Sequence, residues 1–146
     1  MSIRESVSSK IITLLTNIQD PQVVLCTREP FEADKIAITQ FPAILTQLVQ
    51  EERESITMGV QAVGRRSGTM TYEIRGFVRG TDLDTQRTKL ITAIENALDR
   101  DRYLGLQSSG VLDSQVRLIE IVPRLAPLAE FRIEFVVRYN YLRGAK

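Results

Sequence analysis

Residues 131–142 alternate strictly between two sets of side chains, and this pattern constrains the fold more than any other in the chain. Successive side chains of a β-strand point to opposite faces, so the alternation predicts a strand with one continuous apolar face. That face carries Phe131, Ile133, Phe135, Val137, Tyr139 and Tyr141. The segment is long and free of proline, so we expect it in the interior of a sheet and not at an edge.

Two segments have the helical spacing of apolar residues that can cover this face. The first runs over about residues 3–18, and Ser2 with Glu5 fits a capping box at its start. The second runs over about residues 83–99, after a cap at Thr81 and Asp82. We expect the apolar stripes of both helices to pack against the 131–142 strand.

The remaining apolar runs predict an α+β domain that spans residues 1–146. Strands grouped between two helices favour a mostly antiparallel sheet of four to five strands, with two amphipathic helices packed on one face. Glycines and charged residues over about 50–68 indicate a long hairpin or loop, whose tip we place at residues 64–68. The other strands are expected at about 23–27, from 41 onward, and at 69–79 and 116–122, the last pairing with 131–142.

Composition restricts the classes of function. The 146 residues carry 43% hydrophobic and 25% charged residues with a net charge of +1, which is ordinary for one globular domain and argues against a dedicated nucleic-acid binder. No apolar run is long enough to span a membrane, so we expect no membrane partner. The N-terminal residues lack the apolar core of a signal peptide, so we expect synthesis and retention in a cytoplasm.

Candidate chemistry is sparse. The chain has no histidine, which removes the commonest general base and the commonest metal ligand. Its single cysteine, Cys26, lies in an apolar run, and a buried structural thiol is expected there. The carboxylates of Glu51, Glu52 and Glu54 can serve acid–base chemistry or a divalent ion only if they converge, and we expect a solvated hairpin arm instead. We therefore predict no enzyme, no cofactor and no metal site.

Two further charged groups are candidates for contacts with other molecules. Arg65 and Arg66, at the predicted hairpin tip, can contact phosphate or an acidic partner, although the loop lacks the aromatic residues of a nucleic-acid platform. Asp101 and Arg102 belong to a run of alternating charge after the second helix. That run is typical of a solvated helix exit with weak local ion pairs, and a subunit contact is the other interpretation.

Four segments together resemble a known family. They are Phe-Pro-Ala-Ile at 41–44, Tyr-Glu-Ile-Arg-Gly-Phe-Val at 72–78, Asp-Arg-Tyr-Leu-Gly at 101–105 and Phe-Val-Val-Arg-Tyr at 135–139. In their order along the chain, which covers nearly all of it, they resemble the tail terminator and minor tail proteins of tailed bacteriophages. The resemblance implies an α+β subunit that assembles as a hexameric ring in the virion, at the junction of tail and neck, after synthesis in the host cytoplasm.

The resemblance also implies a role and a set of partners. Such a ring caps the tail tube, ends tube polymerisation and offers a surface to the neck, so the partners are the tube protein, neck or connector proteins and DNA passing non-specifically through the ring. We hypothesise that the acidic arm and the arginine tip lie on different faces, and that the polar face of 131–142 lies near a neighbour or the channel. Candidate contact residues are Glu51, Glu52, Glu54, Arg65, Arg66, Asp101, Arg102, Arg132 and Arg138.

Three other functions compete with this one. The nearest is another neck component, such as a head-completion, connector or sheath-associated adaptor protein. The second is a cellular module that binds a small molecule or nucleic acid, which salt-dependent retention on DNA would favour. The third is an enzyme, which a metal bound between the carboxylates of Glu51, Glu52 and Glu54 would favour.

Overall fold

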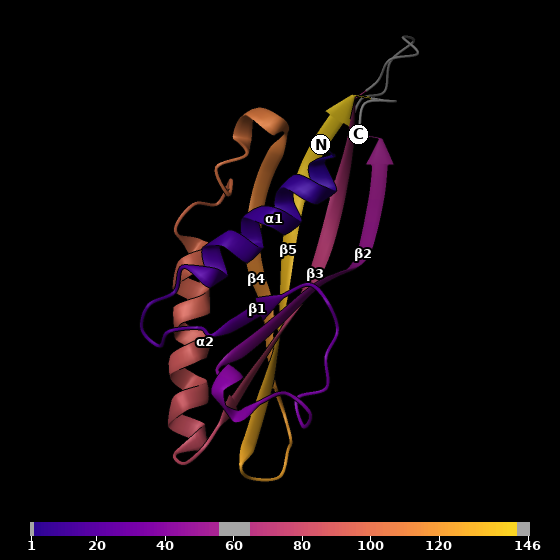
Figure 1. Ribbon diagram of the computed structural model, residues 1–146. Helices are drawn as coiled ribbons and strands as arrows, with labels where there is room; N and C mark the ends of the chain where they lie inside the picture. Colours follow the sequence, from indigo (N-terminus) through magenta and orange to yellow (C-terminus); the bar gives the residue numbers. More distant parts are fainter. Residues whose placement is uncertain (1, 56–64, 143–146) are drawn as a thin grey trace.

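The computed structural model describes residues 2–55 and 65–142. For residues 54, 55, 65, 66 and 142 it describes the backbone only. Two helices and a five-stranded, mostly antiparallel sheet form an α+β fold (Figure 1). The elements are α1 Ile3–Thr16, β1 Leu25–Thr27, β2 Ala43–Ser55, β3 Arg65–Arg79, α2 Leu83–Asp99, β4 Val111–Val122 and β5 Leu128–Leu142. The predicted fold class is confirmed.

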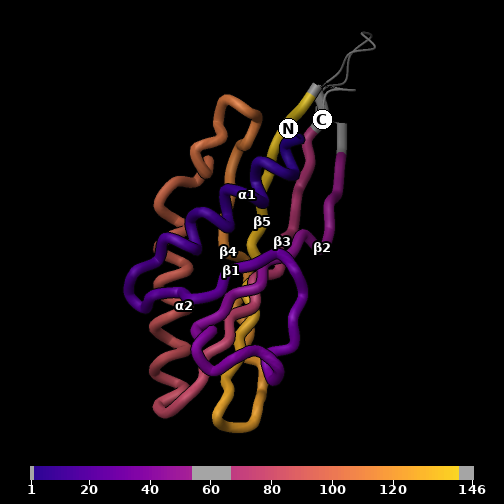
Figure 2. Tube along the Cα trace, viewed as in Figure 1, coloured from indigo at the N-terminus to yellow at the C-terminus, as the bar shows by residue number. Residues whose placement is uncertain are grey.

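The strands lie in the order β1-β2-β3-β5-β4, so β5 is an interior strand as its sequence predicts (Figure 2). It pairs with β3 from Arg79↔Leu128 to Arg65↔Leu142 and with β4 on its other side. Only the short β1–β2 pair is parallel among the named strands, and it covers β2 from Ala43 to Leu45.

The main hydrophobic core forms on the apolar face of β5. All six predicted side chains of that face are buried, and Phe131, Ile133, Phe135 and Val137 are fully inaccessible to solvent. They share one cluster with alternate residues of β3 and with both helices. The helix residues of this cluster include Val7, Ile11 and Leu15 of α1 and Leu90, Ile94 and Leu98 of α2. Burying each such side chain contributes about 1.5–3 kcal/mol, which makes this cluster the chief stabilising feature.

The helix boundaries follow the sequence closely, but their caps differ from the prediction. Ser2 Oγ accepts a hydrogen bond from the Glu5 amide at 3.2 Å, which confirms half of the capping box. The Glu5 carboxylate is held instead by Arg28, at 2.8 and 3.1 Å. Helix α2 has the predicted bounds, yet Asp82 has a left-handed backbone (φ 51°) and makes no side-chain capping bond, so its predicted role as a cap is wrong.

The predicted hairpin or loop over about 50–68 contains two strand arms that pair antiparallel, and these arms reach further than predicted. Residues up to Ser55 belong to β2, and Arg65 to Gly68 belong to β3, where they pair with β2 and with the end of β5. Gly68 fits this position because the ring of Tyr139 fills the space that a side chain would occupy. The predicted tip at 64–68 is therefore strand from Arg65 onward, while Gly64 lies outside the described residues.

Two further segments differ from the prediction. Strand β4 begins at Val111, five residues earlier than predicted, because register shifts after Val111 and Val116 break its two-residue alternation. Cys26 lies in β1, only partly buried and packed against the main core, and burial raises the pKa of its thiol. Neither described helix is long and apolar enough to cross a membrane.

The opposite face of the sheet carries a second, smaller cluster. Phe77 and Leu128 are buried there with Leu45, beneath a chain segment that includes Phe31 and Phe41. Among the described residues, the only β5 residue in this cluster is Leu128, which precedes the predicted strand of residues 131–142. We call the part of this face near Leu128, at the start of β5, its lower part, and the part toward the end of β5 its upper part. The connecting segment after β1 covers the lower part and leaves the upper part open to other contacts.

Candidate functional site

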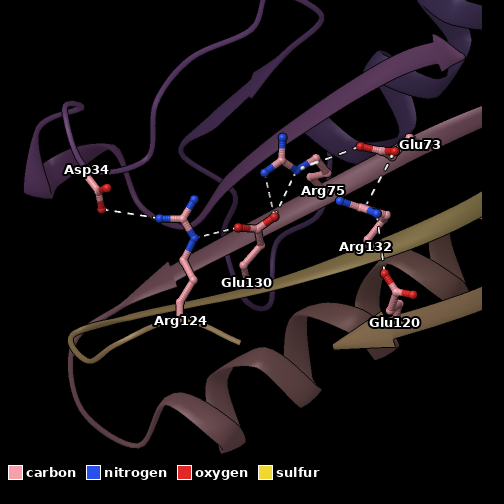
Figure 3. Close-up of polar contacts among 7 residues, drawn as sticks. All are labelled: Asp34, Glu73, Arg75, Glu120, Arg124, Glu130 and Arg132. Carbon is pink, nitrogen blue, oxygen red and sulfur yellow. Dashed lines mark hydrogen bonds and ion pairs between the residues drawn. The ribbon is translucent and has the colours of Figure 1, made fainter. Parts of the chain in front are cut away.

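Charged side chains dominate the sheet face that lies opposite the main core, and we call it the charged face. It is defined by Glu73 and Arg75 of β3, Glu130, Arg132 and Glu134 of β5, and Glu120 of β4. Figure 3 shows these residues except Glu134. The register sets Arg75 against Arg132 and Glu73 against Glu134, so like charges lie directly opposite each other. Direct cross-strand pairs of like charge are unfavourable, and the attraction comes instead from diagonal neighbours.

The lower end of the charged face is built around Glu130, whose side chain is only 1% exposed. Arg75 donates to one carboxylate oxygen at 2.7 and 3.0 Å, and Arg124 donates to the other at 2.6 Å (Figure 3). Arg124 also reaches Asp34 at 3.4 Å and therefore ties the covering segment to the sheet. Both guanidinium groups lie near the Phe77 ring, at 5.4 and 5.6 Å from its centroid. This end is a closed structural cluster.

The upper end of the charged face is held more loosely. Arg132 reaches Glu120 at 3.5 Å and Glu73 at 3.7 Å, and its Nε is buried without a hydrogen-bond partner. Glu134 is paired with Arg117 at 3.1 Å. Pairs of this length and exposure contribute about 0–1 kcal/mol each, so these side chains can exchange partners at little cost.

A shallow hollow of about 210 Å³ lies over this upper end. Val49 of β2 and Leu118 of β4 line it from opposite edges of the sheet, and Glu73, Arg132 and Glu134 line it from the two central strands. Ligand pockets are usually enclosed and mostly apolar, with few polar groups. Three carboxylates and one arginine line this hollow beside its apolar residues, so it carries more charge than a usual ligand pocket.

Glu51 is not a solvated carboxylate, contrary to our expectation for the hairpin arm. It accepts hydrogen bonds from Arg4 of α1 at 3.0 and 3.1 Å, from Arg53 at 2.8 Å and from the Tyr139 hydroxyl at 2.9 Å. The side chain is 14% exposed. The bulge between Leu48 and Gln50 shifts the alternation of β2 and directs Glu51 toward the core side of the sheet. It ties the start of α1 to the hairpin, so Glu51 has a structural contact instead of a free carboxylate.

This arrangement changes two ionisation equilibria. Burial raises the pKa of Glu51, but the hydrogen bonds from Tyr139, Arg4 and Arg53 outweigh it, and the net pKa lies below the usual value of 4.5. Burial, followed by the neighbouring Glu51 carboxylate, raises the pKa of Tyr139 from 10.0 to about 12. The ionised Glu51 carboxylate thus stabilises the fold above its usual pKa of 4.5, and this stabilisation is lost as the pH falls through its lowered pKa. The stabilisation from neutral Tyr139 is complete below pH 10 and is lost as the pH rises toward about 12.

Replacing Glu51 with Gln should lower the pKa of Tyr139, because an amide lacks the negative charge that disfavours the phenolate. Tyrosinate absorbance followed against pH measures the change, and the Tyr139→Phe variant identifies which step belongs to this residue. The neighbouring Glu52→Gln substitution is the matched control and should leave that step in place. An unchanged Tyr139 step in Glu51→Gln would contradict the assigned network.

Asp101 and Arg102 make local contacts after α2. The Asp101 carboxylate accepts hydrogen bonds from the backbone amides of Tyr103 at 2.9 Å and Gly105 at 2.8 Å. Arg102 pairs with Asp113 of β4 at 3.1 Å and lies over the Tyr103 ring. Asp101 therefore shapes the turn, whereas the 61% exposed Arg102 is still accessible to a neighbouring molecule.

The remaining predicted residues are not gathered at one place. Glu52 is exposed and accepts a hydrogen bond from Gln50, and Arg138 is exposed on the same side of β5 as Arg132. The side chains of Glu54, Arg65 and Arg66 lie outside the described residues, so the hypothesis that the acidic arm and the arginine tip occupy different faces stays a prediction. Of the nine predicted contact residues, the structure places Arg132 in the charged face.

Sequence reasoning missed the most strongly held charge, Glu130. The strand begins at Leu128, three residues earlier than predicted, so Glu130 lay just before the predicted strand of residues 131–142. The nearby Arg124 and the aromatic Phe31 are signals that become informative only once the segment after β1 is known to fold over this end.

Within residues 2–55 and 65–142, no group of three or more His, Cys, Asp or Glu side chains is placed to hold a metal ion. Glu51 and Glu52 in particular have separate partners. The sequence matches no protein-family model, and no curated protein matches it. The candidate site is thus defined by its geometry alone, as a charged and partly apolar surface.

Proposed function

We propose that this chain is a structural subunit of a bacteriophage tail, which assembles as a ring on the tail tube, ends tube polymerisation and presents a surface to the neck. Its partners in this proposal are further copies of itself, the tube protein and neck proteins, with DNA passing through the ring. The sequence resemblance suggested this role, and it requires a rigid subunit with contact surfaces instead of a reactive centre.

The observation that carries the proposal is the construction of the charged face. Its lower end is fixed by the buried carboxylate of Glu130 between two arginines, whereas its upper end is an open hollow with loosely paired charges. A rigid sheet thereby holds exchangeable charged groups at its surface. Such groups give orientation and partner choice in protein contacts more than they give affinity.

Disrupting the gene in a phage that encodes this chain should give over-long tails, because nothing would then end the growth of the tube. Electron microscopy of the particles measures tail length and head attachment together. Tails of normal length that fail to join heads would assign the protein to another neck component. Normal, complete and infectious particles would overturn a structural role in the tail.

A charge reversal tests the surface itself. Arg138→Glu places an acid on the exposed upper part of β5, where it should lower the titre of infectious particles by about tenfold or more, since like charges brought together at an interface cost several kcal/mol. Lys89→Glu changes another exposed charge, on α2, and is the matched control, with an unchanged titre expected. Equal titres for both variants would show that the exposed part of β5 beside the charged face makes no essential contact.

A further inference from the structure

Exposed apolar side chains gather at the two edges of the sheet. Among the described residues, six of the eight large hydrophobic side chains that are exposed lie on or beside the outer strands, and the other two, Ile38 and Leu125, lie in connecting segments. The six are Val24, Val49, Leu112, Leu118, Ile119 and Ile121. This distribution is informative because long apolar edge strands promote association, and proteins either blunt them or cover them.

The edge formed by β4 is apolar on both faces of the sheet. We call residues level when they are direct partners across neighbouring strands or are joined by a row of such partners. Leu118 is level with Glu134, so it lies on the side of the charged face. Ile119 and Ile121 are level with Ile133 and Phe131, so they lie on the core side. These three side chains are 52%, 37% and 48% exposed. A partner that docks on one face of the sheet would cover only part of this set. An added strand covers both faces and also pairs with the free backbone groups of the edge.

The opposite edge of the same chain has the matching properties. Strand β1 covers β2 only from Ala43 to Leu45, so in the part of the chain that the structure describes β2 has no outer neighbour from Thr46 to Ser55. Val49 is 53% exposed on this free stretch, and Leu48 is partly buried on the core side. Both edges are therefore long and open, and β2 contributes one exposed large hydrophobic side chain, Val49, to its described free stretch.

We infer that the free edge of β2 in one copy adds to β4 of the next copy, so that the sheet continues from subunit to subunit in a head-to-tail arrangement. Strands β2, β3, β5 and β4 alternate in direction, so copies of equal orientation bring β4 and β2 together as an antiparallel pair (Figure 2). The contact uses two different patches, and such heterologous contacts close into rings when the rotation permits.

The register within one subunit indicates which residues of the two edges meet when copies join at equal height. Leu48 is level with Tyr72, Phe135 and Val116, and Thr46 is level with Ile119. Leu118 is level with Gln47, whereas Ile121 is level with Ile44, where β1 already pairs with β2. The edge pairing therefore sets Val116, Leu118 and Ile119 of β4 beside residues 46–48 of β2 and leaves the charged face open for other partners.

This inference deepens the proposed ring and rests on that proposal only for closure of the assembly. Its test uses the full chain and light scattering at increasing concentration, with a subunit mass of 16.5 kDa as the reference. The β4 variant carries Leu118→Lys and Ile119→Lys, and the β2 variant carries Val49→Lys. Leu125→Lys is the control, because Leu125 is 90% exposed in the turn between β4 and β5.

The expected result is an oligomer for the unchanged chain and for the control, and a monomer for each edge variant alone. Mixing the two edge variants should give a dimer, because each still has one intact edge of the opposite kind. A β2 variant that dimerises by itself would show pairing between two β4 edges and overturn the inference. An unchanged chain that stays monomeric, or edge variants that keep the oligomer, would overturn it as well.

Cross-linking keeps the test decisive if an edge variant fails to fold. In a Cys26→Ser background, Gln50→Cys with Gln115→Cys, two exposed positions at the same height, should give a ladder of cross-linked oligomers with a short bis-maleimide, while either cysteine alone should give no ladder. Absence of the ladder overturns the pairing. Tail length after gene disruption is independent of these measurements, so normal tails alongside a confirmed edge pairing would overturn only the proposed function.

Discussion

Replacing Arg75 and Arg124 together with methionine should lower the free energy of unfolding by about 3–5 kcal/mol, the range found when a buried charge loses its partners. The substitutions keep apolar stems beside Phe77 but leave the Glu130 carboxylate, which is 1% exposed, without a cation. Urea denaturation of the purified chain measures the loss. Arg117→Met is the matched control. The side chains of Arg117 and Glu134 are 60% and 26% exposed, so their ion pair should contribute no more than about 1 kcal/mol.

A third substitution makes this prediction specific to charge. Adding Glu130→Leu to the methionine pair removes the buried carboxylate itself, so most of the lost stability should return. Replacing a complete buried ion cluster with apolar residues is often neutral or stabilising, whereas removing one side of it is not. A triple variant no more stable than the double variant would show that packing around Arg75 and Arg124, and not the burial of charge, causes the loss.

Gly76→Ala should lower the free energy of unfolding by about 1–3 kcal/mol, the usual cost of overfilling a packed core. A Cβ at this position would overlap the ring of Phe131, which lies directly across from it on β5. Phe131 is fully buried in the main core, so its ring has no free space into which it can move. The close approach of this ring to the backbone is the reason that glycine is required.

A double-mutant cycle tests that reason. Phe131→Leu removes the ring and is itself destabilising. In the Phe131→Leu background, Gly76→Ala should lower the free energy of unfolding by less than it does in the unchanged chain. The coupling free energy should be about 0.5–3 kcal/mol, as found for residues in direct contact. Chemical denaturation of the four proteins gives the coupling free energy. Purely additive effects would contradict a steric conflict between these two positions.

Several features of the fold could be predicted because they depend on local pattern. The alternation in β5 identified six of its seven described residues in the main core, all except Ala129, and the helical spacing of α2 gave its bounds. The pattern failed where a bulge interrupts it. In β4 the register shifts hid the first residues of the strand, and in β2 a shift after Leu48 directs Glu51 toward Tyr139.

The charged face was only partly foreseeable. Arg132 was a candidate because it lies on the polar side of a recognisable strand, but nothing in its neighbours along the chain indicates Glu73 and Glu120 as its partners. These groups are 59 and 12 residues away in sequence and meet only through strand pairing. The exposed apolar residues of β4 were likewise visible as residues, but their position at an edge depends on the strand order.

The sequence by itself determined the class of fold, the two helices and the central strand, because backbone periodicity and side-chain polarity act over a few neighbouring residues. Tertiary structure alone decided which carboxylates are buried, where the small second cluster forms and which strands are left with a free edge. Those properties follow from the register and order of the strands, which depend on contacts between residues distant in the chain. The alternation of β5 therefore specified its two faces, while the partners of each charge on them were set by the assembled sheet.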